Sequence, residues 1–194
     1  MIMGYSVEGS TDRALLKGLR DRWCPQMEMV EGHFRGSTGE SRRREISKIC
    51  DEFAFKGVDV MVFTTDANDR PWREVKKEEQ DRFPPARLSL AIVGVADRNV
   101  ECWICRDAAY VAERLGVSAD VLSVADPKSG FESAIGLSRD DRKEAEIAAL
   151  VLTAPLERWL DEPSFADFYE QLRDVSQRSG CAIENLRERG TGRE

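Results

Sequence analysis

One segment restricts the fold of this chain more than any other: residues 58–65 read Val-Asp-Val-Met-Val-Phe-Thr-Thr. The segment is almost continuously apolar and rich in β-branched residues, which is typical of a strand covered on both faces in a parallel sheet. Residues 88–95 have the same character, and residues 2–7 form a shorter apolar strand. A sheet built from such strands needs helices on both of its faces.

Helical patterns separate these strands along the chain. Residues 11–23, 41–55, 71–82 and 100–115 are predicted to be helices, and residues 27–31 a further short strand. Strands that alternate with helices are typical of α/β proteins, because each helix carries the chain from one parallel strand to the next. We therefore predict a Rossmann-like fold with a central, mostly parallel sheet of about four strands flanked by helices.

The second half of the chain differs from the first. After Gly116, helical patterns follow one another with no strand between them. We expect three parts: an α/β domain over residues 1–130, a helical C-terminal extension packed on it over residues 131–184, and a flexible polar tail over residues 185–194.

Composition and missing motifs argue against several classes of protein. No apolar run approaches the ~20 residues that span a bilayer, and the first residues lack the basic and apolar regions of a signal peptide. The five cysteines are few and odd in number, which indicates reduced thiols. We therefore expect a cytoplasmic protein without a membrane partner. The P-loop pattern is absent, so nucleotide hydrolysis would come from a partner chain.

The net charge of −7 is unevenly distributed. Residues 1–106 hold 18 Lys and Arg and 18 Asp and Glu, so the whole negative excess lies in residues 107–194. A negative chain normally disfavours nucleic acid as a partner. Here the first part is neutral, and a divalent cation bound by its carboxylates would leave that part positive.

Acidic residues follow three of the predicted strands directly or within one helical turn. Glu8 follows the first strand, Asp66 and Asp69 follow the second, and Glu101 lies shortly after the third. The carboxyl ends of parallel strands share one edge of a sheet, where α/β proteins bind their ligands. Several carboxylates without a histidine cluster suit a hard cation, so we predict a site for Mg²⁺ or Mn²⁺.

Each of these residues also has an explanation that involves no ligand. Glu8 would serve the amides of the following helix as a turn carboxylate. Asp66 and Asp69 would form a solvated Asx turn. Glu101 would complement the dipole of its helix from the first turn. The sequence leaves these alternatives open for each residue, while the shared position at strand ends favours a common site.

Three short segments carry motifs in a recognisable order. Residues 7–12 read Val-Glu-Gly-Ser-Thr-Asp, residues 66–69 read Asp-Ala-Asn-Asp, and residues 99–107 read Asn-Val-Glu-Cys-Trp-Ile-Cys-Arg-Asp. The first two resemble the Glu-Gly-x-Thr-Glu turn and the Asp-x-Asp motif of Toprim domains, particularly those of the overcoming-lysogenization-defect (OLD) nucleases. The third resembles the Ile-Glu-Ala-Trp-type helix of small Toprim-like bacterial proteins. The resemblance covers roughly residues 1–130.

The resemblance implies roles for individual residues. Glu8 would act as general acid or base or as a metal ligand. The metal for phosphodiester chemistry would be held together with Asp66, Asn68, Asp69 and Glu101. The second position of Asp-x-Asp is Asn68 here, with Asp69 one place later. Asparagine ligates through its carbonyl oxygen but carries no charge. Either Asp69 takes its place, or the metal is held more weakly, or catalysis has been lost.

Basic residues near these motifs are candidates for contact with phosphates. The candidates for nucleic-acid binding are Arg42, Arg43, Arg70, Arg73 and Lys76. A solvated helix face paired with neighbouring glutamates explains them equally well. The resemblance also implies that Lys128 joins Glu8 and Asp66 as a catalytic residue that stabilises charge, although a surface turn explains Lys128 equally well.

Two functions follow from this reading. The first is divalent-metal-dependent hydrolysis of phosphodiester bonds in nucleic acid, with DNA as the first candidate, by a Toprim- and OLD-like nuclease. The resemblance implies a setting in phage defence or DNA repair, with an ATPase as partner. The second is a non-catalytic Toprim-like subunit that binds a partner or nucleic acid. Asn68 and the acidic helical half favour the second function.

Overall fold

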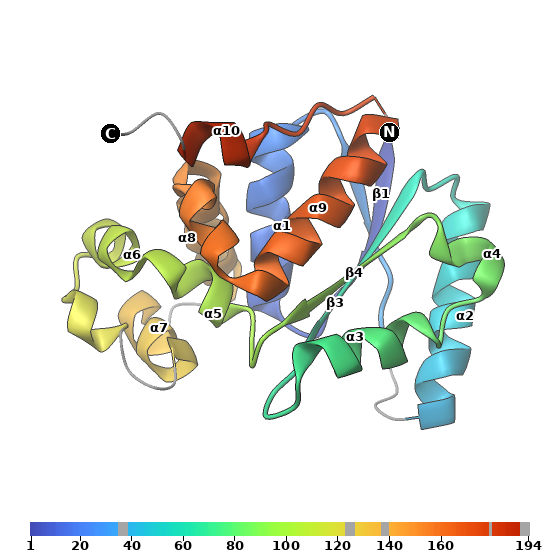
Figure 1. The fold of residues 1–194 in the computed structure, drawn as a ribbon, viewed down its shortest axis with the longest axis horizontal. Coiled ribbons are helices and arrows are strands. Elements are labelled where there is room, and N and C mark those ends of the chain that lie inside the picture. Colours follow the sequence, from blue (N-terminus) through green and yellow to red (C-terminus); the bar gives the residue numbers. More distant parts are fainter. Residues whose placement is uncertain (35–38, 123–126, 137–139, 179, 191–194) are drawn as a thin grey trace.

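Four parallel strands form the centre of the protein (Figure 1). The computed structural model describes residues 1–34, 39–122, 127–136, 140–178 and 180–190. The sheet order is β2-β1-β3-β4, with bounds β1 (Ile2–Ser6), β2 (Glu28–Glu31), β3 (Val60–Asp66) and β4 (Ala91–Ala96). This parallel sheet, flanked by helices, confirms the predicted α/β fold.

The two faces of β3 are buried in two separate apolar cores. Val60 and Val62 point to the core that contains α1 (Ser10–Trp23). Met61 and Phe63 point to the opposite core, which contains α2 (Gly39–Phe55) and α3 (Trp72–Gln80). The near-continuous apolar sequence of this strand is therefore explained by helices on both sides, as Figure 1 shows.

The C-terminal helices complete the cover on the α1 side. α8 (Asp140–Thr153) packs along α1, where a side chain at Gly18 would meet the backbone oxygen of Ala148 at 2.7 Å. α9 (Pro163–Arg178) packs on β4. The Gln171 side chain of α9 accepts a hydrogen bond from Val93 N and donates one to Val93 O, both at 3.1 Å. This pairing protects the exposed edge of β4.

Several elements begin or end at residues other than those predicted. β4 starts at Ala91 rather than residue 88, because residues 85–88 form the short helix α4 (Pro85–Leu88). The helix expected over residues 100–115 is divided, because Asp107 accepts a hydrogen bond from Tyr110 N and starts a new helix there. The remaining elements are α5 (Glu101–Ile104), η1 (Cys105–Asp107), α6 (Ala108–Leu115), η2 (Ala119–Val121), α7 (Pro127–Ile135), η3 (Leu156–Asp161) and α10 (Leu186–Gly190).

The expected flexible tail is wrong for its first residues. Leu186 is fully buried, and its backbone N–H donates to the Tyr169 hydroxyl at 3.0 Å. Tyr169 in turn donates to the carbonyl of Glu184 at 2.7 Å. A single buried leucine within a polar stretch anchors the short helix α10, while residues 191–194 lie outside the described residues.

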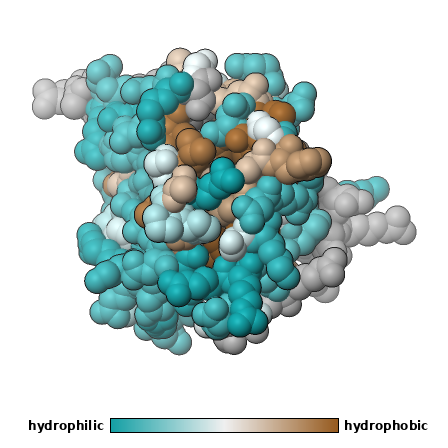
Figure 2. Space-filling view, turned by 90° about the vertical axis from the view of Figure 1, so that its right-hand side faces the viewer, coloured by the Kyte–Doolittle hydropathy of each residue, from teal (hydrophilic) through white to brown (hydrophobic). Residues whose placement is uncertain are grey.

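The surface carries apolar side chains on the side of α2 and α4. Figure 2 shows a largely hydrophilic face with apolar groups gathered in its upper part. Phe55, at the end of α2, is 92% exposed, and Leu88 and Leu90 are also exposed. Among the described helices, none combines the length and the apolar character needed to cross a membrane.

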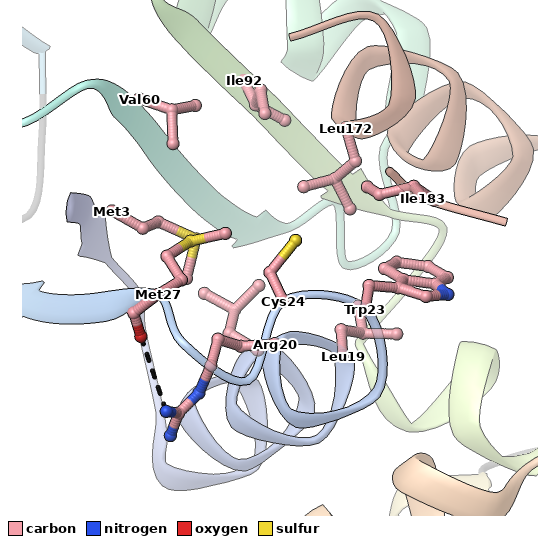
Figure 3. A pocket seen from close by; sticks show the side chains of 11 residues that line it. Met3, Leu19, Arg20, Trp23, Cys24, Met27, Val60, Ile92, Leu172 and Ile183 are labelled. Carbon is pink, nitrogen blue, oxygen red and sulfur yellow. Dashed lines mark hydrogen bonds between the residues drawn. The ribbon is translucent and has the colours of Figure 1, made fainter. Parts of the chain in front are cut away.

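The expectation that all cysteines are reduced is also wrong in this structure. Cys24, at the end of α1, forms a disulfide with Cys181, and both residues are buried. Figure 3 shows Cys24 in an apolar pocket, with Leu172 of α9 and Ile183 nearby. The bond joins residues 157 positions apart. Their proximity depends on the packing of the C-terminal segment and gives no local signal in the sequence.

We predict that the disulfide stabilises the fold by restricting the unfolded chain. Cys181→Ser should lower the free energy of unfolding by about 2–5 kcal/mol, because the bond closes a long loop. Urea unfolding with and without a reductant measures this change. Cys50→Ser is the control, since Cys50 is a free buried thiol, and its urea midpoint should respond to reductant as the wild type does. Detection of five alkylated thiols in the unreduced, denatured wild type would contradict the pairing.

Candidate functional site

The direction of the chain reverses across the sheet at β1. From β1 the chain goes by α1 to β2 on one side, and then returns by α2 to β3 on the other side. In open α/β sheets, ligands bind at the carboxyl edge where the strand order reverses in this way. The loop after β1 and the end of β3 therefore border the expected place for a ligand.

A cavity of about 310 Å³ lies at this edge, and acidic side chains dominate its lining. Glu8 follows β1, Asp66 ends β3, and Glu101 begins α5 after β4. Asp12 joins them from the first turn of α1. The structure thus brings three predicted ligands together and adds two carboxylates, Asp12 and, from α7, Glu132. The basic side chains that line the same cavity are Lys128 and Lys143.

Asp12 is the functional residue that the sequence analysis missed. Its side chain is buried, and Thr64 Oγ1 donates a hydrogen bond to Oδ1 at 2.8 Å. Burial raises the pKa of Asp12 to about 6, and the charges of Glu101 and Glu8 add to the rise, while the Thr64 hydrogen bond opposes it. The helical periodicity could have predicted that Asp12 is buried, because Asp12 shares the buried face of α1 with Leu15, three residues later.

Asp66 has the more strongly shifted carboxyl group of the two. Burial and the negative charges of Asp12, Glu8 and Glu101 together raise its pKa to about 7, whereas Lys128 opposes the rise. Val100 N donates to Asp66 Oδ1 at 3.2 Å. A half-buried carboxyl group surrounded by like charges holds its proton near neutral pH unless a cation compensates for the charge.

Glu8 is more accessible than Asp12, Asp66 and Glu101. Its side chain is 39% exposed, and Thr65 donates a short hydrogen bond to Oε1. Arg42 Nη1 lies 3.6 Å from the same oxygen. Glu101, by contrast, is almost fully buried. The cavity therefore combines two accessible carboxylates, Glu8 and Glu132, with the half-buried Asp66 and the buried Asp12 and Glu101.

Asn68 and Asp69 lie outside the acidic cavity. Asn68 has a φ of 54°, and its Nδ2 donates to the carbonyl of Asp66 at 3.4 Å. It lines a neighbouring cavity that also includes Glu8 and Asp66. Asp69 is exposed and lines neither cavity. The turn after β3 thus directs Asp66 inward and leaves Asp69 at the surface.

The chemistry of the donor set fits a hard divalent cation. The acidic cavity offers five carboxylates, and neither histidine nor cysteine is among the described residues that line it. Oxygen donors of this kind suit Mg²⁺ and Mn²⁺. In the part of the chain that the structure describes, no three acidic, histidine or cysteine side chains are arranged so as to hold a metal ion. The ligands would have to draw closer around a cation.

The predicted phosphate contacts are already engaged within the protein. Arg42 is largely buried between Glu8 and Glu79. The contacts of the other four candidates are Arg43 with the carbonyl of Asp81 at 2.9 Å, Arg70 with Glu78 at the surface, Arg73 over the Trp72 ring at 4.6 Å, and Lys76 with Asp167 at 2.6 Å. These contacts favour the alternative in which such residues pair with the protein's own acids and backbone.

Comparison with known proteins adds no relative to this picture. The chain matches no protein-family model, no curated protein and no solved structure. The function is therefore inferred from the residues of the acidic cavity and their place in the fold. Glu8, Asp12, Asp66 and Glu101 are the residues on which that inference depends.

We predict that Asp12 destabilises the protein at neutral pH. Because its folded pKa is raised, its stabilising contribution is complete below about pH 4 and is lost as the pH rises through about 6. Asp12→Asn keeps an acceptor for Thr64 and removes the charge. It should raise the free energy of unfolding by about 2 kcal/mol at about pH 7.5 and change it little at about pH 4.

Urea unfolding across this pH range measures the effect. Asp21→Asn is the matched control, because Asp21 is exposed on the same helix, and it should shift the urea midpoint little at either pH. An Asp12→Asn variant that is equally destabilised at both pH values would contradict the prediction.

Proposed function

We propose that this protein is a divalent-metal-dependent phosphodiesterase that acts on nucleic acid, with DNA as its first candidate substrate. One observation carries the proposal: carboxylates from three strand ends and from the first turn of α1 line one cavity where the strand order reverses. The carboxylates of such a cluster repel one another in the absence of a cation. A divalent cation relieves the repulsion and makes the same edge attractive to phosphate.

The residues divide into ligands and residues that act on the substrate. Asp66, Asp12 and Glu101 would hold Mg²⁺ or Mn²⁺ from the buried side, with Glu8 closing the site. When bound there, such a metal would supply the chemistry of activating water and stabilising a leaving oxygen. Glu8, being partly exposed, would serve either as this last ligand or, where it does not bind the metal, as the base that accepts a proton from the attacking water. Lys128 lines the cavity and provides positive charge for the phosphate.

The resemblance to Toprim domains supports the same activity. Its Glu-Gly turn falls at Glu8, its first aspartate at Asp66, and its later helix at Glu101, all at the cavity. By this resemblance we propose a nuclease of the Toprim and OLD type in the cytoplasm, acting in phage defence or DNA repair with an ATPase partner. Asp69 differs from the pattern because it lies outside the cavity.

The proposed activity predicts loss of cleavage when Asp66 is removed. Purified protein should cut plasmid or single-stranded DNA in the presence of Mg²⁺ or Mn²⁺, and Asp66→Ala should reduce the rate at least about 100-fold, because a central ligand of the proposed metal is lost. Asp97→Ala is the control, since Asp97 is exposed after β4 and does not line the cavity. Undiminished cleavage by Asp66→Ala, or no cleavage by the wild type, would refute the nuclease.

A second function is favoured by specific observations. The described carboxylates do not form a ready three-ligand metal site, and Asn68 stands where Toprim domains have an aspartate. A non-catalytic subunit that binds a partner protein or nucleic acid would keep the fold without these ligands. The acidic helical half would then provide the surface for a basic partner.

Calorimetric titration with Mn²⁺ separates the two functions. The phosphodiesterase should show saturable binding with a sub-millimolar dissociation constant, because several carboxylates face one cavity. Glu8→Ala should weaken that binding. Glu45→Ala should not, because Glu45 lines a different pocket. Absence of saturable Mn²⁺ binding in the wild type would instead support the non-catalytic subunit.

A further inference from the structure

A buried glutamate of α3 stands beside the acidic cavity. Glu79 is only 6% exposed. Its carboxylate lies 2.9 Å from Arg42 Nε and accepts a short hydrogen bond from Arg82. A buried carboxylate is stable when ionised only if partners of opposite charge surround it. The two arginines satisfy that requirement, and Glu79 in return determines where the Arg42 guanidinium lies.

Arg42 links Glu79 to the acidic cavity. Its Nε binds Glu79, and its Nη1 lies 3.6 Å from Glu8 Oε1. The guanidinium also lies over the ring of Phe34, 4.7 Å from the centroid. Its side chain is only 11% exposed. Arg42 is therefore held on three sides and has little freedom to meet a phosphate in solvent.

Two groups of the protein converge on one oxygen of Glu8. Thr65 donates a hydrogen bond to Oε1, and Arg42 approaches the same atom. Both of these contacts of Glu8 with the described residues are made at Oε1. The second oxygen, Oε2, is thus the atom of Glu8 that remains for a ligand in the cavity.

We propose that Glu79 is a positioning residue, which holds Arg42 so that Glu8 presents Oε2 to the divalent cation. The inference rests on the proposed function. A guanidinium can bind one carboxylate through Nε and another through Nη1, whereas an ammonium has no such fork. If Glu79 no longer holds Arg42, the guanidinium closes on Glu8 and competes with the cation. Arg42 then acts through Glu8, in place of the phosphate contact expected for it.

The experiment measures the Mn²⁺ dissociation constant by calorimetry in the full chain, below the unfolding transition of each variant. Glu79→Gln should weaken Mn²⁺ binding about tenfold, as is typical when a partner of a metal ligand is removed. Glu78→Gln is the matched control. It removes the same charge one residue earlier. Glu78 lines the same neighbouring cavity as Glu79, and its ion pairs among the described residues are with Arg70 and Arg82 rather than Arg42. We expect its dissociation constant to stay within about twofold of the wild type.

A conservative substitution separates positioning from charge. Arg42→Lys keeps the positive charge beside Glu8 and removes the fork, so it should also weaken Mn²⁺ binding severalfold. It tests the inference independently if Glu79→Gln does not fold. Equal dissociation constants for Glu79→Gln and Glu78→Gln, or wild-type binding by Arg42→Lys, would overturn the inference and leave the metal site standing. Absence of saturable binding in the wild type would overturn the proposed function and the inference together.

Discussion

Burial of β3 on both faces is the constraint on which the rest of the structure depends. An apolar strand of this kind requires helices on each side of the sheet, and the chain meets this by placing α1 on one face and α2 and α3 on the other. The chain then runs from β1 to β2 on one side of β1 and returns to β3 on its other side. The reversal beside β1 opens a gap at the carboxyl edge, and Glu8 and Asp66 stand there because each follows a neighbouring strand.

The fold keeps the carboxylates of the acidic cavity close together although their negative charges repel one another. Asp66 is half-buried beside three other acids, and burial together with their charges raises its pKa to about 7. The carboxylates at this edge of the sheet repel one another, and basic side chains, among them Lys128 and Arg42, offset part of the repulsion. Such local conflict between charge and stability is typical of functional sites.

Helix α1 connects this cavity with the C-terminal half of the protein. Its first turn carries Asp12, and its middle permits close packing of α8 because Gly18 has no side chain. Its last residues lead to Cys24, which is bonded to Cys181. The helices that follow residue 131 therefore share one apolar core with the α/β part.

The sequence by itself determined the parallel α/β fold and the presence of acids at three strand ends. Those features depend on periodicity and on neighbours in the chain, which are local. The tertiary structure decided that Asp12 joins the cavity, that Asp69 stays outside it, and that Arg42 is buried between Glu8 and Glu79. It also decided the Cys24–Cys181 pairing. These outcomes depend on distances between residues far apart in the chain, and those distances exist only once the helices have packed on the sheet.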